Sequence, residues 1–185
     1  MMLGKIDAMI EKVNTQNAAV MPAQKAFWHS LDVLRRATPR FHGMSVPHAP
    51  VHGDFTPYNL LLPDDGRTAG IDFLVHGRMP VTFDVCHFLV YLDVHRFWLT
   101  SARALRKQGC NQPDMDHFFE GYGDAISGLA PNAFLYCHLS EVLRRWATLL
   151  LLKHDGRPHG WKRKLELFRV ARMARHMAAG LAKTL

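Results

Sequence analysis

The stretch HGDFTPYNLLL, residues 52–62, places an acid and an amide directly before a short apolar run. Asp54 lies two residues after His52 and five before Asn59, and a second acid, Asp72, ends the next apolar run. Carboxylate and amide oxygens are ligands of hard cations such as Mg²⁺, which fills its other positions with water and phosphate oxygens. A carboxylate beside a metal-bound phosphate can also accept the proton of an attacking hydroxyl. These residues therefore predict a metal-assisted phosphotransfer site.

A β-hairpin is predicted to bring the two halves of this site together. The apolar runs NLLL and TAGIDF are separated by PDDGR, whose residues favour turns. If the turn is centred between Asp65 and Gly66, Asn59 lies directly opposite Asp72, and paired residues have Cβ atoms about 5 Å apart. This register predicts that both side chains bind one cation, and a slip of one residue would undo it.

The rest of the chain is predicted to be helical, so the expected fold class is mainly α with a small β-hairpin. Apolar residues recur at helical spacing in residues 3–13 and 27–34, with Pro22 suited to a first turn. Residues 83–109 read as a buried helix ended by Gly109, and residues 112–126 as a further helix. A long helix from Pro131, closed by Gly156, and a basic helix follow.

Composition indicates one domain of a soluble, cytoplasmic protein. The chain has 185 residues, 48% of them hydrophobic, which is enough for one sizeable core. Its three cysteines form no C-x-x-C pair, and no apolar run is long enough to cross a bilayer. The expected location is therefore the reducing cytoplasm, and the chain is expected to have no transmembrane segment.

The formal net charge of +7 favours an anionic partner, and much of the excess lies in the last helix. Helical spacing there predicts one apolar face with Trp161, Leu165, Phe168 and Met173, and basic residues mostly on the other. We interpret the basic face as solvated, because no nucleic-acid reader motif accompanies it. A basic helical nucleic-acid binder is the weakest of the functions considered.

The segments HGDFTPYN and IDF resemble the catalytic loop and metal-binding segment of the aminoglycoside phosphotransferase and choline kinase group, distant relatives of protein kinases. The resemblance implies Asp54 as catalytic base, with His52 beside it as a support of the catalytic loop. It implies Asn59 and Asp72 as metal and cofactor-binding residues, with Mg²⁺ and ATP as cofactors. Asp84, at the start of the next helix, would brace the loop.

The same resemblance implies a β-rich N-terminal lobe that the residues before His52 do not match. They read as helical and contain neither a G-x-G-x-x-G run nor a V-A-I-K-like strand. We therefore expect one domain, residues 1–185, that forms the C-terminal lobe of a protein-kinase-like fold without its N-lobe. Residues 1–50 would be a helical lead-in, 51–73 the catalytic loop and hairpin, and 83–185 a helical bundle. The N-lobe would be truncated, lost, or supplied by a separate chain, and a homodimer is a further expectation.

The predicted activity is phosphorylation of a small-molecule hydroxyl, and the alternative is an inactive lobe that serves as a binding or regulatory module. Taken singly, Asp54, Asn59 and Asp72 could be turn or strand-end residues. Their ordered spacing together favours a phosphotransfer site. Other acids could line a pocket for a cationic substrate or lie on solvated faces: Asp93, Asp114, Asp116, Glu120, Asp124 and Glu141. The histidine spacings do not indicate a zinc site.

Overall fold

The computed structural model describes residues 2–16, 21, 24–64, 66–74, 77–95, 112–122, 128–152 and 160–185. Its helices are α1 (Met2–Gln16), α2 (Lys25–Phe41), α3 (Thr82–His95), α5 (Gln112–Tyr122), α6 (Pro131–Leu151) and α7 (Trp161–Ala182). The short strands are β1 (His48–Pro50), β2 (Leu60–Leu61), β3 (Ala69–Gly70) and β4 (Arg78–Pro80), and a 3₁₀ turn, η1, covers Pro57–Asn59. The predicted mainly helical fold with a small hairpin is confirmed, whereas the strand pair of β1 and β4 was not predicted, and β1 lies at the end of the expected helical lead-in, residues 1–50.

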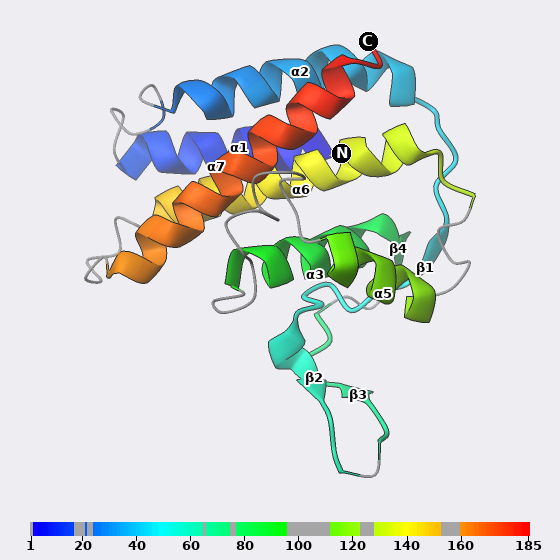
Figure 1. Cartoon of the computed structure of the whole chain (residues 1–185). Coiled ribbons are helices and arrows are strands. Elements are labelled where there is room, and N and C mark those ends of the chain that lie inside the picture. Colours follow the sequence, from blue (N-terminus) through cyan, green and yellow to red (C-terminus); the bar gives the residue numbers. More distant parts are fainter. Residues whose placement is uncertain are drawn as a thin grey trace.

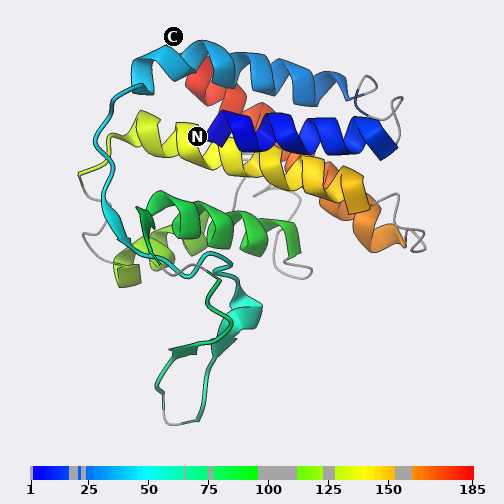
Figure 2. The same ribbon diagram turned by 180° about the vertical axis from the view of Figure 1, so that it is seen from behind.

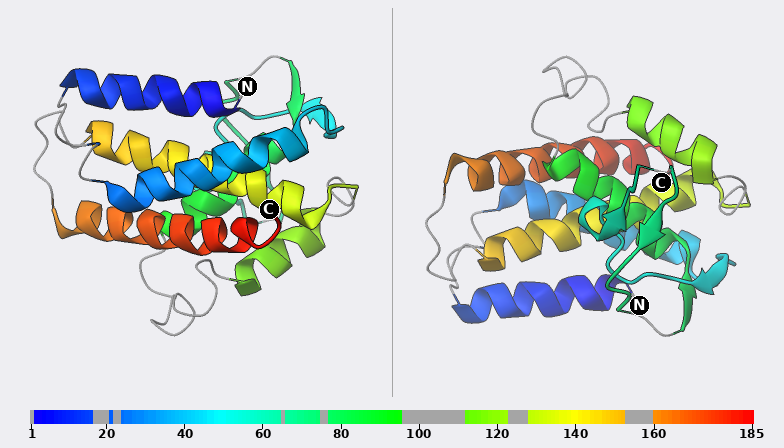
Figure 3. Two further views of the ribbon diagram at one scale, coloured as in Figure 1. Left: turned by 90° about the horizontal axis from the view of Figure 1, so that it is seen from above. Right: turned by 90° about the horizontal axis from the view of Figure 1, so that it is seen from below.

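Helix α6 lies at the centre of the bundle and packs against α1, α2, α3 and α7 (Figures 1 and 2). Pro131 begins it, where a missing backbone N–H costs nothing, and its apolar residues face the core on several sides. Phe27 of α2 is fully buried and meets Trp146 of α6 edge to face, with ring centroids 5.5 Å apart. Burial of one such side chain contributes about 1.5–3 kcal/mol. Helices α1 and α2 thus share one core with α6 and α7 (Figure 3).

Several predicted helix ends differ from the structure or lie outside the described residues. Helix α2 begins at Lys25, three residues after Pro22, whose own placement is outside the described residues. The described part of α3 ends at His95 and that of α6 at Leu151, so the predicted ends at Gly109 and Gly156 are not tested.

The predicted apolar face of α7 is partly wrong. Trp161 is 60% exposed and Phe168 is 51% exposed, whereas Met173 and the basic residue Arg169 are buried. The buried face is set by the later turns, where Val170, Met173 and Met177 meet the core. In the first two turns the aromatic side chains remain at the surface, although Leu167 packs against the core.

The strands form two separate antiparallel pairs, β1 with β4 and β2 with β3. The β2–β3 hairpin projects from the helices (Figure 1). Its register differs by one residue from the prediction, because Leu60 pairs with Gly70 and not with Ile71. The Gly66 N–H bonds to the carbonyl of Pro63 at 3.1 Å, so Gly66 closes the turn and is not at its centre. The predicted direct pairing of Asn59 with Asp72 is therefore wrong.

None of the described helices combines the length and apolar composition that are needed to cross a membrane.

Buried His138 of α6 should make stability depend on pH. Burial lowers its pKa from 6.5 to about 4, although the charge of Glu141 acts in the opposite direction. The folded protein holds this histidine neutral while the unfolded chain takes up a proton below pH 6.5, so stability is lost as pH falls from 6.5 to about 4. A difference of this size is worth about 3 kcal/mol. We expect urea unfolding to show this loss in the wild type.

The variant His138→Leu should lose about 3 kcal/mol less stability over the same pH interval, because position 138 then has no site for the proton, and the remaining loss comes from other groups such as His95. His29→Leu, at an exposed position of α2, is the matched control and should keep the wild-type pH dependence. Identical pH profiles for wild type and His138→Leu would show that this residue does not carry the effect.

Candidate functional site

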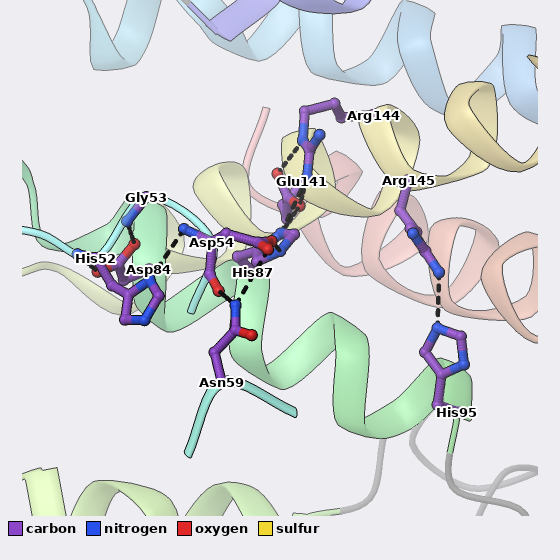
Figure 4. Close-up of polar contacts among 10 residues, drawn as sticks. All are labelled: His52, Gly53, Asp54, Asn59, Asp84, His87, His95, Glu141, Arg144 and Arg145. Carbon is purple, nitrogen blue, oxygen red and sulfur yellow. Dashed lines mark hydrogen bonds and ion pairs between the residues drawn. The ribbon is translucent and has the colours of Figure 1, made fainter. Parts of the chain in front are cut away.

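The loop that carries Asp54 is held by the first turn of α3. The carboxylate of Asp84 accepts hydrogen bonds from the backbone N–H of His52 at 2.5 Å and of Gly53 at 3.0 Å (Figure 4). Gly53 has φ +86°, which other residues adopt only with strain. The loop therefore turns at Gly53 and presents Asp54 in a fixed place above α3.

The side chain of Asp54 is 45% exposed and is oriented by Asn59. The Asn59 amide Nδ2 donates to the Asp54 backbone carbonyl at 2.8 Å and to its carboxylate Oδ2 at 3.2 Å. The η1 turn places Asn59 for these bonds, with its own N–H bonded to the Thr56 carbonyl. Because the amide nitrogen faces Asp54, the amide oxygen of Asn59 is directed elsewhere.

His87 binds the other carboxylate oxygen of Asp54. Its Nε2 lies 3.1 Å from Asp54 Oδ1, and its Nδ1 lies 2.8 Å from Glu141 Oε1 and 3.0 Å from Arg144 Nη2. In one arrangement Nδ1 accepts a hydrogen bond from Arg144, and the neutral ring then carries its proton on Nε2. In the other arrangement Nδ1 donates to Glu141, and beside an ionised Asp54 the ring is then protonated on both nitrogens. In either state an Nε2–H donates to Asp54.

Glu141 anchors this network from α6. It is 3% exposed, and Arg144 donates to both of its oxygens at 2.6 and 2.7 Å. Burial alone would raise the pKa of Glu141, but hydrogen bonds and charge from Arg144 and His87 outweigh it and lower the pKa. The glutamate is therefore held ionised behind His87.

His52 is a buried member of the loop. Its ring is 5% exposed and stacks on Phe73 with centroids 4.3 Å apart. Its Nδ1 accepts from the Asp54 N–H at 3.4 Å, a long bond. Gly70 lies against the same pair, since a Cβ there would come within 3.1 Å of the Phe73 ring. His52 thus joins the loop to the hairpin and has no contact with the Asp54 carboxylate.

Asp72 is brought beside the loop by backbone bonds on both sides of it. The Ile71 N–H donates to the Asn59 carbonyl at 3.0 Å, and the Leu74 N–H donates to the His52 carbonyl at 2.9 Å. Asp72 is exposed and has φ +59°, an uncommon value that aspartate tolerates better than most residues. In the described part of the chain its carboxylate makes no hydrogen bond or ion pair.

The structure thus gathers His52, Asp54, Asn59 and Asp84 into one network and places Asp72 at its edge. Sequence reasoning missed the role of His87, although it lies one helical turn after Asp84 on the same predicted face. It also allowed a solvated explanation for Asp93 and Glu141, which is wrong because both are buried. Asp116 and Glu120 are exposed, Asp124 lies outside the described residues, and nothing is described of the Asp114 side chain.

The comparison with known protein families shows to which family the chain belongs. Residues 7–121 match the phosphotransferase enzyme family. The chain belongs to this family. The predicted resemblance to aminoglycoside phosphotransferases is thereby confirmed at the level of the family, and the match includes the Asp54 loop, the hairpin and α3. Searches of curated proteins and of solved structures gave no match. The family supports a phosphotransferase activity of the kinase type.

Proposed function

We propose that this member of the phosphotransferase enzyme family uses ATP and Mg²⁺ to phosphorylate a hydroxyl group of a small molecule. The observation that carries the proposal is the Asp54 carboxylate. It is half-exposed, lies on a braced loop, and receives one hydrogen-bond donor on each oxygen. Such a group can accept a proton from a substrate and hold the hydroxyl in place for attack.

In the proposed step Asp54 acts as base. The substrate hydroxyl donates its proton to the carboxylate while its oxygen forms the new bond to the γ-phosphorus, and the bond from that phosphorus to the ADP oxygen breaks. His87 and Asn59 orient the carboxylate. His52 and Asp84 act one step further away, because they hold the loop and do not reach the carboxylate oxygens.

Asn59 and Asp72 fit a Mg²⁺ site by the chemistry of their donors. The contacts of Asn59 with Asp54 use its nitrogen and leave its oxygen for a cation. Asp72 offers an exposed carboxylate from a backbone that is tied to both His52 and Asn59. A bound Mg²⁺ would neutralise phosphate charge as the phosphoryl group moves. In this proposal the two residues hold the cofactor, although they are not direct partners in the hairpin.

We further propose that this chain acts as the C-terminal lobe and that an N-lobe, from a longer form or a separate chain, covers the nucleotide. Six exposed large apolar side chains gather in residues 58–74, around the projecting hairpin: Tyr58, Leu61, Leu62, Ile71, Phe73 and Leu74. Such a concentration of exposed apolar surface is characteristic of an interaction site. An N-lobe that packs on the hairpin would bury it and close the nucleotide cleft.

The contact from His87 to Asp54 provides a test of the proposed geometry. We expect His87→Leu to lower kcat about 10- to 100-fold, because the carboxylate loses a charge-assisted donor. The KM for Mg-ATP should change little, since His87 does not touch the proposed metal ligands. Steady-state kinetics of the protein with its N-lobe supplied would measure both.

His87→Gln is the informative control, because its amide N–H can replace the lost donor, and it should recover part of kcat. A general structural defect would instead lower both variants alike and would alter the thermal unfolding midpoint of both. Equal kcat for wild type and His87→Leu would contradict the positioning role.

A further inference from the structure

A row of polar and aromatic side chains runs along α3, from the Asp54 partner His87 to the end of the described helix. His87, Tyr91 and His95 are spaced four residues apart and therefore share one face of the helix, which carries the chain about 12 Å from the first to the last. The Tyr91 and His95 rings stack at 4.1 Å, and Arg145 Nη2 lies 2.6 Å from His95 Nε2. Figure 4 shows the Arg145–His95 pair well separated from the pair formed by His87 and Asp54.

This end of the helix borders a cavity of about 570 Å³. Tyr58 lines it from the η1 turn and His95 from α3, while the start of α7 contributes Trp161, Lys162 and further residues. Tyr58 precedes Asn59 in the sequence and meets Tyr91 edge to face at 5.6 Å. The cavity is thus lined by elements next to Asp54, and a molecule on the order of 10 Å long would reach from His95 to His87, the Asp54 partner two helical turns away.

Cations outnumber acids around the cavity in the described residues. Arg145, Lys162, Arg163 and Arg169 lie in or beside it. The acids are Asp93, which lies nearby, and Glu166, which lines the cavity 3.3 Å from Arg163 and 3.4 Å from His95. Burial, followed by the charges of Arg145, Arg163 and Arg169, lowers the pKa of His95 to about 4. The formal charges of the four cations and two acids around the cavity therefore sum to a positive value.

The buried side chain of Arg169 has one hydrogen-bond donor that no described residue accepts from. This cavity-lining side chain is only 5% exposed, and its Nη1 donates to the Val94 carbonyl at 3.0 Å. Its Nε has no hydrogen-bond partner within the described part of the chain. A buried guanidinium with an unused donor costs free energy unless an acceptor reaches it.

The first turn of α7 also departs from ordinary helix chemistry. Lys162 and Arg163 lie at the positive end of the helix dipole, and the turn contains no acid. The charge of Arg163 is offset by an ion pair with Glu166 at 3.3 Å, whereas the charge of Lys162 opposes the helix dipole. Departures from the usual residue preferences of a helix are expected at functional or strained sites.

We infer that this cavity binds the anionic end of the phosphate acceptor, a polyhydroxyl compound with a phosphate or carboxylate group about 10 Å from the hydroxyl that Asp54 would deprotonate. The inference rests on the proposed function and narrows it to a substrate class. Tyr58 is 71% exposed and Trp161 is 60% exposed, and these two cavity-lining side chains offer aromatic surface for a sugar ring. A polycationic aminoglycoside would be repelled from the same site.

Calorimetric binding of three related disaccharides to the chain tests this inference. Lactose is neutral, lactobionate carries a carboxylate and lactose 1-phosphate carries a phosphate, and kanamycin is the cationic comparison. We expect at least one anionic probe to bind about tenfold or more tightly than lactose, and kanamycin to bind no better than lactose. The preference should weaken with added salt. The better of the two anions identifies the acceptor group.

Two charge reversals on α7 form a matched pair. Lys162→Glu should weaken binding of the anionic probe about tenfold, whereas Lys164→Glu, on an exposed position two residues away and outside the cavity lining, should leave it within about twofold. Both substitutions place an acid at the helix N-terminus, where it stabilises the helix, so neither loss can be attributed to unfolding.

The inference is overturned if no anionic probe binds more tightly than lactose, or if both charge reversals weaken binding equally. Phosphorylation of neutral or cationic acceptors with no preference for anions would also overturn it while leaving the proposed function intact. Anion binding at this cavity in a protein that transfers no phosphate from Mg-ATP would instead refute the proposed function and retain the site.

Discussion

Asp54→Asn is expected to lower the turnover number about 10²- to 10⁴-fold while Mg-ATP affinity stays nearly unchanged. Asparagine has almost the same shape and can still accept a hydrogen bond from His87 Nε2–H, so the loop should remain in place. It cannot take up the substrate proton, and this loss appears in kcat. Steady-state kinetics and calorimetric titration with Mg-ATP, with the N-lobe supplied, would measure the two quantities.

Asp72→Asn is the matched comparison, because it removes the same charge from a neighbouring segment. In the proposed site Asp72 would hold the Mg²⁺ ion that neutralises phosphate charge, so this variant should also weaken Mg-dependent nucleotide binding. If the two variants lose nucleotide affinity equally, their roles have been assigned incorrectly. A fully active Asp54→Asn variant would make this aspartate a turn residue.

Glu141→Gln should lower the free energy of unfolding by about 3–5 kcal/mol. The carboxylate is 3% exposed and pairs with Arg144 and His87, so its replacement leaves a mostly buried guanidinium without its counter-charge. Asp32→Asn breaks an exposed ion pair with Arg36 and should cost less than about 1 kcal/mol. Urea unfolding at neutral pH compares the two variants.

Acid should reduce the difference between Glu141→Gln and the wild type. The folded-state pKa of Glu141 is lowered, so the stability from its charge is present above the ordinary glutamate pKa and is lost as pH falls through the folded value. An equally stable Glu141→Gln variant at neutral pH would show that Arg144 does not depend on this carboxylate.

The grouping of His52, Asp54 and Asn59 could be predicted from sequence because they lie within eight positions of one another, and local spacing limits where their side chains can be. The hairpin was also predictable from its turn formers. Its register was not, because several adjacent turn residues allow the chain to reverse at more than one place. Backbone hydrogen bonds from Ile71 and Leu74 bring Asp72 beside the loop. The strand-pairing rules for a hairpin do not predict these two bonds.

The polar network behind Asp54 depends on tertiary contacts. His87 and Glu141 lie far apart in sequence and meet only because α3 packs on α6. In a single sequence, an acid on an amphipathic helix reads as solvated, and only the packing shows that Glu141 faces inward. The same limit applies to Arg169, a basic residue of α7 that is buried beside the end of α3.

The central claim is that Asp54 serves a Mg-dependent phosphotransfer site, and its most direct test is ADP formation from Mg-ATP in the presence of hydroxyl acceptors. The assay would compare wild type and Asp54→Asn, each supplied with an N-lobe, with and without a chelator. We expect the wild type to form ADP and phosphorylated acceptor only when Mg²⁺ is present, and the variant to be at least about 100-fold slower. A wild type that transfers no phosphate, or a variant that transfers it at the same rate, would contradict the account.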